Sequence, residues 1–272
     1  MKKIVFALLL LCPLSASAWS SVGHKVVIEV AKRHLTDKAR EGIAALMPYD
    51  ITDDAAYMDY HRRDSNLLYA FHYHELCINL ETLEYDPNPL VESGDMMRAL
   101  RLADYNLSHR QNCTDSVAVL NMRMLIHFVG ELHCPVHLGI PSIWQPKPPY
   151  RKDFHEWYWK GENVMSFHNF IDYAPARLFE GMTPAEAAAL IDVVSRREGA
   201  RFVKGDFVDW ANDSVKSGFR IYDYFPPLWE IPDTEEPKTI PDDYLDKVGD
   251  ILKYELVKGG YQLAYLLNSY FK

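Results

Sequence analysis

Cysteine is scarce in this chain, which has only four among 272 residues: Cys12, Cys77, Cys113 and Cys134. So few cysteines exclude a fold that depends on a disulfide framework. Cys12 lies in an N-terminal segment that we expect to be removed. The odd number that remains allows at most one internal bridge. Cys134 is a candidate zinc ligand or a partner for Cys77, but we expect a buried, inert thiol.

Positive charge is also in short supply, because 29 Lys+Arg stand against 38 Asp+Glu, a formal net charge of −9. Removal of Lys2 and Lys3 with the N-terminal segment takes the net charge to −11. This balance excludes a basic nucleic-acid-binding surface. If the protein handles anions, bound metal must supply the local positive charge, and three zinc ions would contribute about +6.

Beyond the N-terminus the chain has no long apolar run, so we expect no transmembrane span and no stable membrane insertion. Internal repeats and low-complexity segments are also missing. A hydrophobic content of 48% with 13% aromatic residues indicates a folded globular chain. We therefore expect a single domain with one large core.

Residues 1–18 have the features of a secretory signal: Lys2 and Lys3, an apolar run, and Ala16-Ser17-Ala18 as a cleavage site. We therefore predict a signal peptide over 1–18, a mature domain over 19–272, and a secreted or periplasmic location. Cleavage would leave a free amine on Trp19, five residues before His24. An α-amine, its own carbonyl oxygen and a nearby imidazole can together hold a zinc ion.

Helical periodicity dominates the mature chain and predicts a mainly helical, all-α domain with few or no strands. The predicted helices cover residues 21–35, 36–47, 95–107, 116–132, 183–197, 207–222 and 244–271. Two Pro-rich segments, 138–152 and 226–241, are expected to be a loop and a surface connector.

His127 and Glu131 are four residues apart on the predicted 116–132 helix, so they share one face. His137 follows just past Pro135, which ends this helix. Imidazole, carboxylate and imidazole thus meet in one region, a combination that suits zinc. The alternative is a solvated charged face or a capped core histidine.

Other candidates are weaker when each is taken alone. His72 lies among aromatic residues and follows Asp59 and Arg62, and His155 lies in a second aromatic stretch. A histidine among aromatics is commonly a hydrogen-bonded core residue, and a lone aspartate is commonly a helix cap. We assign surface or packing roles to five further histidines: His34, His61, His109, His133 and His168.

Together these segments resemble the single-strand-specific zinc nucleases of the S-one/P-one type. The resemblance rests on Trp19-Ser-Ser-Val-Gly-His24, Tyr57-Met-Asp59 with Arg62, Phe71-His72-Tyr73, Leu125 to His137, and Trp210-Ala-Asn-Asp-Ser214. It spans nearly the whole mature chain. Bacterial zinc phospholipases C share the ligand plan, so the resemblance leaves the substrate open.

The resemblance implies two to three zinc ions at one end of the helices. The first would take Asp59, His72, His127 and Glu131, and the second Trp19, His24 and a shared Glu131. The third would take His137, His155 and a carboxylate. A hydroxide held between the bridged pair would attack phosphorus. Arg62 would stabilise the leaving oxygen, Tyr73 would stack on a base, and Glu75 would accept hydrogen bonds from it.

The chain departs from the family pattern at three points. The bridging position, usually Asp, is Glu131. Four residues after His155, where the family has a carboxylate, stands Trp159. The Gly-Gly-Asn stretch between the last two histidines is replaced by the Pro-rich 138–152 loop. The bridged pair is therefore better supported by the sequence than the third site.

We expect a zinc-dependent hydrolase that cleaves single-stranded DNA or RNA, 3′-nucleotides, or both. One alternative is a phospholipase C-like hydrolase. Another is a non-catalytic zinc-binding envelope protein whose third site has degraded. The sequence leaves open the choice between DNA and RNA, the oligomeric state, and glycosylation at the three Asn-x-Ser/Thr sites (Asn106, Asn112 and Asn212).

Overall fold

A computed structural model of the chain describes residues 19–61, 76–79, 82–87, 95–139, 157–164, 166–224 and 238–272. The helices are α1 (Ser21–Arg33), α2 (Asp37–Leu46), α3 (Tyr57–His61), α4 (Met96–Ser108), α5 (Asp115–Leu132), α6 (Phe167–Asp172), α7 (Ala174–Leu178), α8 (Pro184–Ile191), α9 (Arg196–Phe202), α10 (Phe207–Arg220) and α11 (Tyr244–Tyr270). Short 3-10 turns are η1 (Ile51–Asp54), η3 (Arg110–Asn112), η4 (Pro135–His137) and η6 (Ile221–Tyr224).

The described strands are all short: β1 (Leu76–Asn79), β2 (Glu84–Tyr85), β3 (Leu138–Gly139), β4 (Trp157–Trp159), β5 (Glu162–Val164) and β6 (Lys238–Thr239). They form two small sheets, β2-β1-β3 and β5-β4-β6, each with one antiparallel and one parallel pair. The predicted all-α class with few strands is confirmed.

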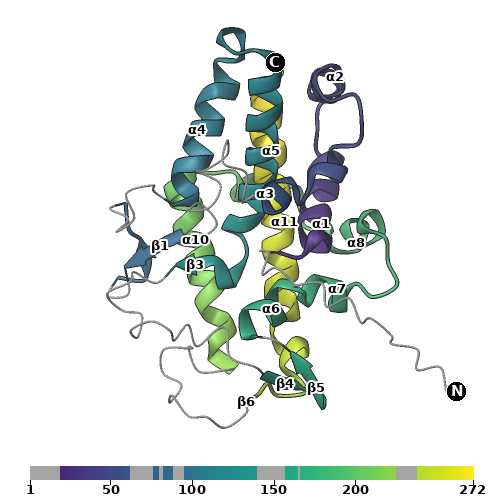
Figure 1. The fold of residues 1–272 in the computed structure, drawn as a ribbon, viewed down its shortest axis with the longest axis vertical. Coiled ribbons are helices and arrows are strands. Elements are labelled where there is room, and N and C mark those ends of the chain that lie inside the picture. The colour runs from purple at the N-terminus through teal and green to yellow at the C-terminus, as the bar shows by residue number, and fades with distance from the viewer. Residues whose placement is uncertain are drawn as a thin grey trace, which may run out of the picture.

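The core is built around α11, the longest described helix, with α1 and α5 packed along it (Figure 1). Val27 and Val30 of α1 are buried at this contact. Gly260 of α11 lies against them, and a Cβ at this position would collide with the side chain of Val30. Glycine here therefore allows α1 and α11 to approach closely, and it fixes the position of the first helix against the last.

Helix α5 carries the residues that the sequence singled out. It begins after Thr114, whose hydroxyl accepts a hydrogen bond from the Val117 amide, an N-cap that stabilises the first turn. From Met124 to Leu132 every residue of the helix is buried. A histidine or glutamate in this stretch is therefore removed from water and needs charged or polar partners.

The predicted 183–197 helix is wrong as a single element, because the chain forms α8 and α9 with a break at residues 192–195. The Asp192 carboxylate lies 2.6 Å from Nε of Arg33 and 3.0 Å from Nε2 of His34, which ties the break to α1. Ser195 then starts α9 by accepting a hydrogen bond from the Glu198 amide. These side-chain contacts outweigh the local helical pattern.

Sequence analysis also missed three short helices, α3, α6 and α7, which have five or six residues each. Helical periodicity needs about 11 or more residues to stand out. Along the described parts of the chain, no helix has the length and apolar character needed to cross a membrane.

Candidate metal centre

Glu131, in the last turn of α5, is fully buried and meets three imidazoles from three different elements. Its Oε1 atom lies 2.9 Å from Nε2 of His127 on the same helix and 3.3 Å from Nε2 of His24 on α1. Its Oε2 atom lies 3.1 Å from Nδ1 of His137 in η4. One carboxylate therefore joins the ends of α1, α5 and η4.

The orientation of His127 is set by the backbone of the segment before α3. Its Nδ1 atom donates a hydrogen bond to the Ala55 carbonyl at 3.1 Å. This bond places the proton on Nδ1, so Nε2 turns its lone pair toward Glu131 and toward Asp59, whose Oδ1 is 3.8 Å away. Such a bond from the second ring nitrogen is typical of histidines that bind metal.

His24 reaches this group because α5 has a glycine opposite it. The His24 and His127 rings stack with centroids 4.4 Å apart. A Cβ on Gly130 would collide with Nδ1 of His24, so only glycine leaves room for the ring. His24 is fully buried, and among the described residues neither of its ring nitrogens has a hydrogen-bond partner with proper geometry. Two unsatisfied buried nitrogens are costly unless a ligand meets one of them.

The distances within this group fit shared metal coordination. Four tetrahedral zinc ligands about 2.1 Å from the ion are about 3.4 Å from one another. The nitrogen–oxygen distances around Glu131 and Asp59 are 2.9, 3.3 and 3.8 Å. The donor types, imidazole and carboxylate, are also those that zinc prefers.

The electrostatics of the group point to bound positive charge. Burial lowers the pKa of His24, and neighbouring His127 lowers it further, so His24 is neutral near pH 7. Burial alone would raise the pKa of Glu131, but His137 and His127 outweigh it and hold the pKa well below its usual value. Burial would lower the pKa of His127, yet Asp59 and Glu131 raise it. The position beside Nε2 of His127 therefore favours a cation.

A second group of donors lies on the other side of His137. Because Nδ1 of His137 faces Glu131, its Nε2 faces Asp172 of α6, 3.7 Å from Oδ1. Nε2 of His168, one turn earlier on α6, lies 3.2 Å from Oδ2 of Asp172. Asp172 is fully buried, and His168 and His137 lower its pKa against the effect of burial.

Cys134 borders this second group. It is buried, and its thiol donates to Oδ1 of Asp172 with a sulfur–oxygen distance of 3.4 Å. Burial raises the pKa of Cys134 well above its usual value, and the Asp172 and Glu131 carboxylates add to the effect. Without a metal ion nearby this group is therefore a neutral thiol. Within the described parts of the chain, no disulfide links Cys77, Cys113 and Cys134 to one another.

Trp19 lies at the junction of the two groups. It is fully buried, and its Cβ packs so closely on Gly23 that no side chain fits at that position. The next amide, that of Ser20, donates to the Asp172 carbonyl at 2.9 Å. The segment Trp19-Ser20 is therefore fixed between the first turn of α1, which holds His24, and the end of α6.

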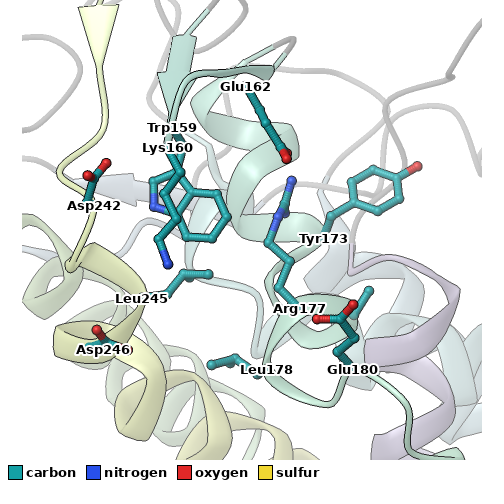
Figure 2. A pocket seen from close by; sticks show the side chains of 11 residues that line it. Trp159, Lys160, Glu162, Tyr173, Arg177, Leu178, Glu180, Asp242, Leu245 and Asp246 are labelled. Atoms are coloured by element: carbon teal, nitrogen blue, oxygen red, sulfur yellow. The ribbon is translucent and has the colours of Figure 1, made fainter.

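A cavity of about 750 Å³ is lined by residues of β4, β5, α7 and the start of α11, together with Tyr173, which directly follows Asp172 in sequence (Figure 2). Arg177 rises through it between Trp159 and Glu162, and Tyr173 stands at its edge with the hydroxyl turned away from Trp159. The guanidinium lies 5.7 Å from the Trp159 ring centre. The cavity lining has two cations but four carboxylates, from Glu162, Glu180, Asp242 and Asp246. The cavity alone therefore does not attract a polyanion.

The structure brings six of the predicted site residues into one region: Trp19, His24, Asp59, His127, Glu131 and His137. Five others lie outside the described residues, so their roles stay predictions: Arg62, His72, Tyr73, Glu75 and His155.

Two residues of this region, His168 and Asp172, were not predicted as site residues from the sequence. His168, for which we expected a surface or packing role, is buried against Asp172, and Asp172 itself was not considered. Their spacing of four residues repeats that of His127 and Glu131, and this repetition was a usable signal. Trp159, where the family pattern led us to look for a carboxylate, instead packs edge-on against Phe170.

Comparison with known families supports the resemblance noted from the sequence. The model of the family described as S1/P1 Nuclease matches residues 19–272. The match begins at Trp19, directly after the predicted signal peptide. Comparison with curated proteins gives no match.

Proposed function

The chain belongs to the S1/P1 nuclease family, and on that basis we propose that it is a zinc-dependent phosphodiesterase. Its proposed substrates are single-stranded DNA or RNA, 3′-nucleotides, or both. The observation that carries this proposal is the contact of one buried carboxylate, Glu131, with three imidazoles from separate elements. Such a group has little value for stability, because burying it costs several kcal/mol per ion.

Two centres would hold the zinc ions. His24, Asp59, His127 and Glu131 surround the first, where the Trp19 amine and His72 are further proposed ligands. His137, His168 and Asp172 surround the second. When bound, zinc polarises a phosphoryl oxygen and makes water a stronger nucleophile at neutral pH.

The residues of the chain prepare both centres for this chemistry. The Ala55 carbonyl accepts the Nδ1 proton of His127, so the Nε2 lone pair of His127 faces the first centre. Nδ1 of His137 lies 3.1 Å from Oε2 of Glu131, so its Nε2 is turned toward Asp172 and the second centre. Tyr173, next to Asp172, keeps its phenol proton because burial raises its pKa and the Asp172 and Asp59 carboxylates add to this. We propose that this hydroxyl donates a hydrogen bond to a phosphate oxygen of the substrate.

The cavity lining counts against a phospholipid substrate. A phospholipase needs an apolar ledge for acyl chains. The described cavity at Tyr173 is lined mainly by charged side chains, with Leu178 and Leu245 among its few aliphatic residues. The alternative of a degraded third zinc site was based on Trp159, which stands where the family has a carboxylate. In the proposed second centre, which includes His137 of that third site, Asp172 offers a carboxylate 3.7 Å from His137, so this alternative is no longer needed.

We also propose that the protein is exported, to the periplasm or the medium, and cut after Ala18. The start of the family match at residue 19 supports this position. The N-terminus of the exported protein, read by mass spectrometry, tests it: the expected first residue is Trp19.

The activity is tested on the mature chain, residues 19–272. Bound metal is counted by elemental analysis, and hydrolysis is assayed on single-stranded DNA, RNA, 3′-AMP and phosphatidylcholine. We expect two to three zinc ions and turnover of at least one nucleotide substrate. Full activity after complete zinc removal would overturn zinc dependence. Turnover of phosphatidylcholine alone would favour the phospholipase.

A further inference from the structure

The second centre has a sulfur donor close by. Cys134 lies in the turn between α5 and η4, three residues before His137, and only 1% of it is exposed. Its Sγ, a ring nitrogen of His137 and a carboxylate oxygen of Asp172 all lie within 4.8 Å of one another. The Cys134 thiol therefore faces the same space as the ligand atoms proposed above.

The distances match those of ligands on one ion. In a tetrahedral zinc site with a zinc–sulfur bond of about 2.3 Å, sulfur and a ligand oxygen are about 3.6 Å apart. The Cys134 Sγ to Asp172 Oδ1 distance is 3.4 Å, and the His137 Nε2 to Asp172 Oδ1 distance is 3.7 Å.

Asp172 gives an independent sign that an ion belongs here. It is fully buried, and among the described residues its Oδ2 atom has no partner with hydrogen-bond geometry, although the His168 ring is 3.2 Å away. A buried carboxylate oxygen in this situation is expected to meet a cation.

Resting on the proposed zinc dependence, we propose that Cys134 is the fourth ligand of the second centre, together with His137, His168 and Asp172. On binding, the thiol proton leaves to water and the sulfur forms a bond to the metal. Four protein ligands close a zinc site, whereas catalytic zinc sites keep one position open for water or substrate. Zinc at this centre would then take water or substrate only by expanding to five ligands.

A thiolate also changes which metals the centre accepts. Sulfur ligands favour zinc and softer metals over magnesium, calcium or manganese. The competing arrangement keeps the Cys134 thiol protonated and only hydrogen-bonded to Asp172. In that arrangement the sulfur makes no bond to the metal.

Cobalt substitution of the mature protein distinguishes the two arrangements without an activity assay. Bound cobalt is first counted by elemental analysis. We expect the fully loaded wild type to show a near-ultraviolet sulfur-to-cobalt charge-transfer band. The Cys134→Ser variant should lose the band, whereas the matched controls Cys77→Ser and Cys113→Ser should keep it.

Absence of the band from the fully loaded wild type, or its persistence in Cys134→Ser, would overturn the proposal. A wild type that binds no cobalt and no zinc would instead overturn the proposed function itself. Should Cys134→Ser not fold, zinc-edge X-ray absorption of the wild type gives the answer. One zinc–sulfur distance of about 2.3 Å supports the bond, and only nitrogen and oxygen neighbours refute it.

Discussion

The Nδ1 atom of His137 lies 3.1 Å from Oε2 of Glu131, while the other oxygen of the same carboxylate lies 2.9 Å from Nε2 of His127. Glu131 therefore contacts histidines of both proposed centres. The family usually has the shorter aspartate here. Glu131 has one more methylene than aspartate, and its two oxygens meet histidines of different elements.

Replacing Glu131 with Gln should remove at least one bound metal ion and lower activity by at least about 100-fold. The amide keeps the shape but loses the charge and one acceptor oxygen. Glu131→Asp keeps the charge with a shorter side chain, so its metal content and activity should lie between those of the wild type and Glu131→Gln. Metal content and initial rates on single-stranded DNA measure both variants. A Glu131→Gln protein with full metal content would contradict the bridging role.

Metal analysis of variants should also show which histidine, His168 or His155, binds metal at the second centre. His168→Ala is expected to lose about one equivalent of metal, because its ring lies 3.2 Å from Asp172. Four side chains already surround that centre, so His155→Ala should keep its full complement. The opposite pattern would return the ligand role to His155.

A single glycine added before Trp19 should lower activity at least tenfold and leave the helical content unchanged. The added residue turns the amine into an amide, which is no metal ligand, and Trp19 is buried with no space around it. The control is a glycine added after Lys272, which is exposed beyond the end of α11. Equal activity of the two extended proteins would exclude the amine as a ligand.

Removal of zinc by a chelator should lower the melting temperature of the mature protein by roughly 10 °C. Without metal, the buried carboxylates of Glu131 and Asp172 lose their strongest counter-charge. Circular dichroism follows the transition, and excess zinc should restore it. An unchanged transition in protein that is confirmed to be zinc-free would count against this coupling.

Because of the raised pKa of Lys258, we expect the folded protein to lose stability at alkaline pH. Its ammonium group is 2% exposed and contacts Glu255 and Asp213. Burial lowers its pKa, but these carboxylates outweigh burial and raise the pKa above 10.5. A folded pKa above the unfolded one gives stability that is present below about pH 10.5 and lost as the pH rises further.

Lys258→Met should therefore cost about 3–5 kcal/mol at pH 7, because it leaves Glu255 buried beside His133 alone. Urea unfolding at pH 7 and above pH 10.5 measures the change. Lys253→Met is the matched control, since Lys253 pairs with an exposed Asp250, and it should cost under about 1 kcal/mol. Equal losses in the two variants would contradict the charge pairing assigned to Lys258.

Much of the metal centre could be predicted before the fold was known. His127 and Glu131 lie four residues apart on a long helix, so local geometry alone places them on one face. Trp19 and His24 were singled out from the predicted signal-peptide cleavage site, their nearness in sequence and the family resemblance. In each case the signal is short-range, and helical geometry fixes the outcome.

His168 and Asp172 were harder to find, because their four-residue spacing was the one signal that marked them. Helix α6 has six residues, too few for a periodic pattern, and nothing near it in the chain marks it as close to His137. The break between α8 and α9 was missed in the same way, because Asp192 is held by Arg33, far away in sequence.

The amino-acid sequence thus determined the helical class and the common face of α5 that carries His127 and Glu131. Its composition determined the scarcity of cysteine and of positive charge. The packing of α1, α5 and α6 decided which imidazoles meet Glu131 and Asp172, and it placed Cys134 beside them. Helix pitch is a local property that neighbouring residues dictate. Which buried donors meet across the core depends on the summed packing of many distant side chains, which no single stretch of the chain contains.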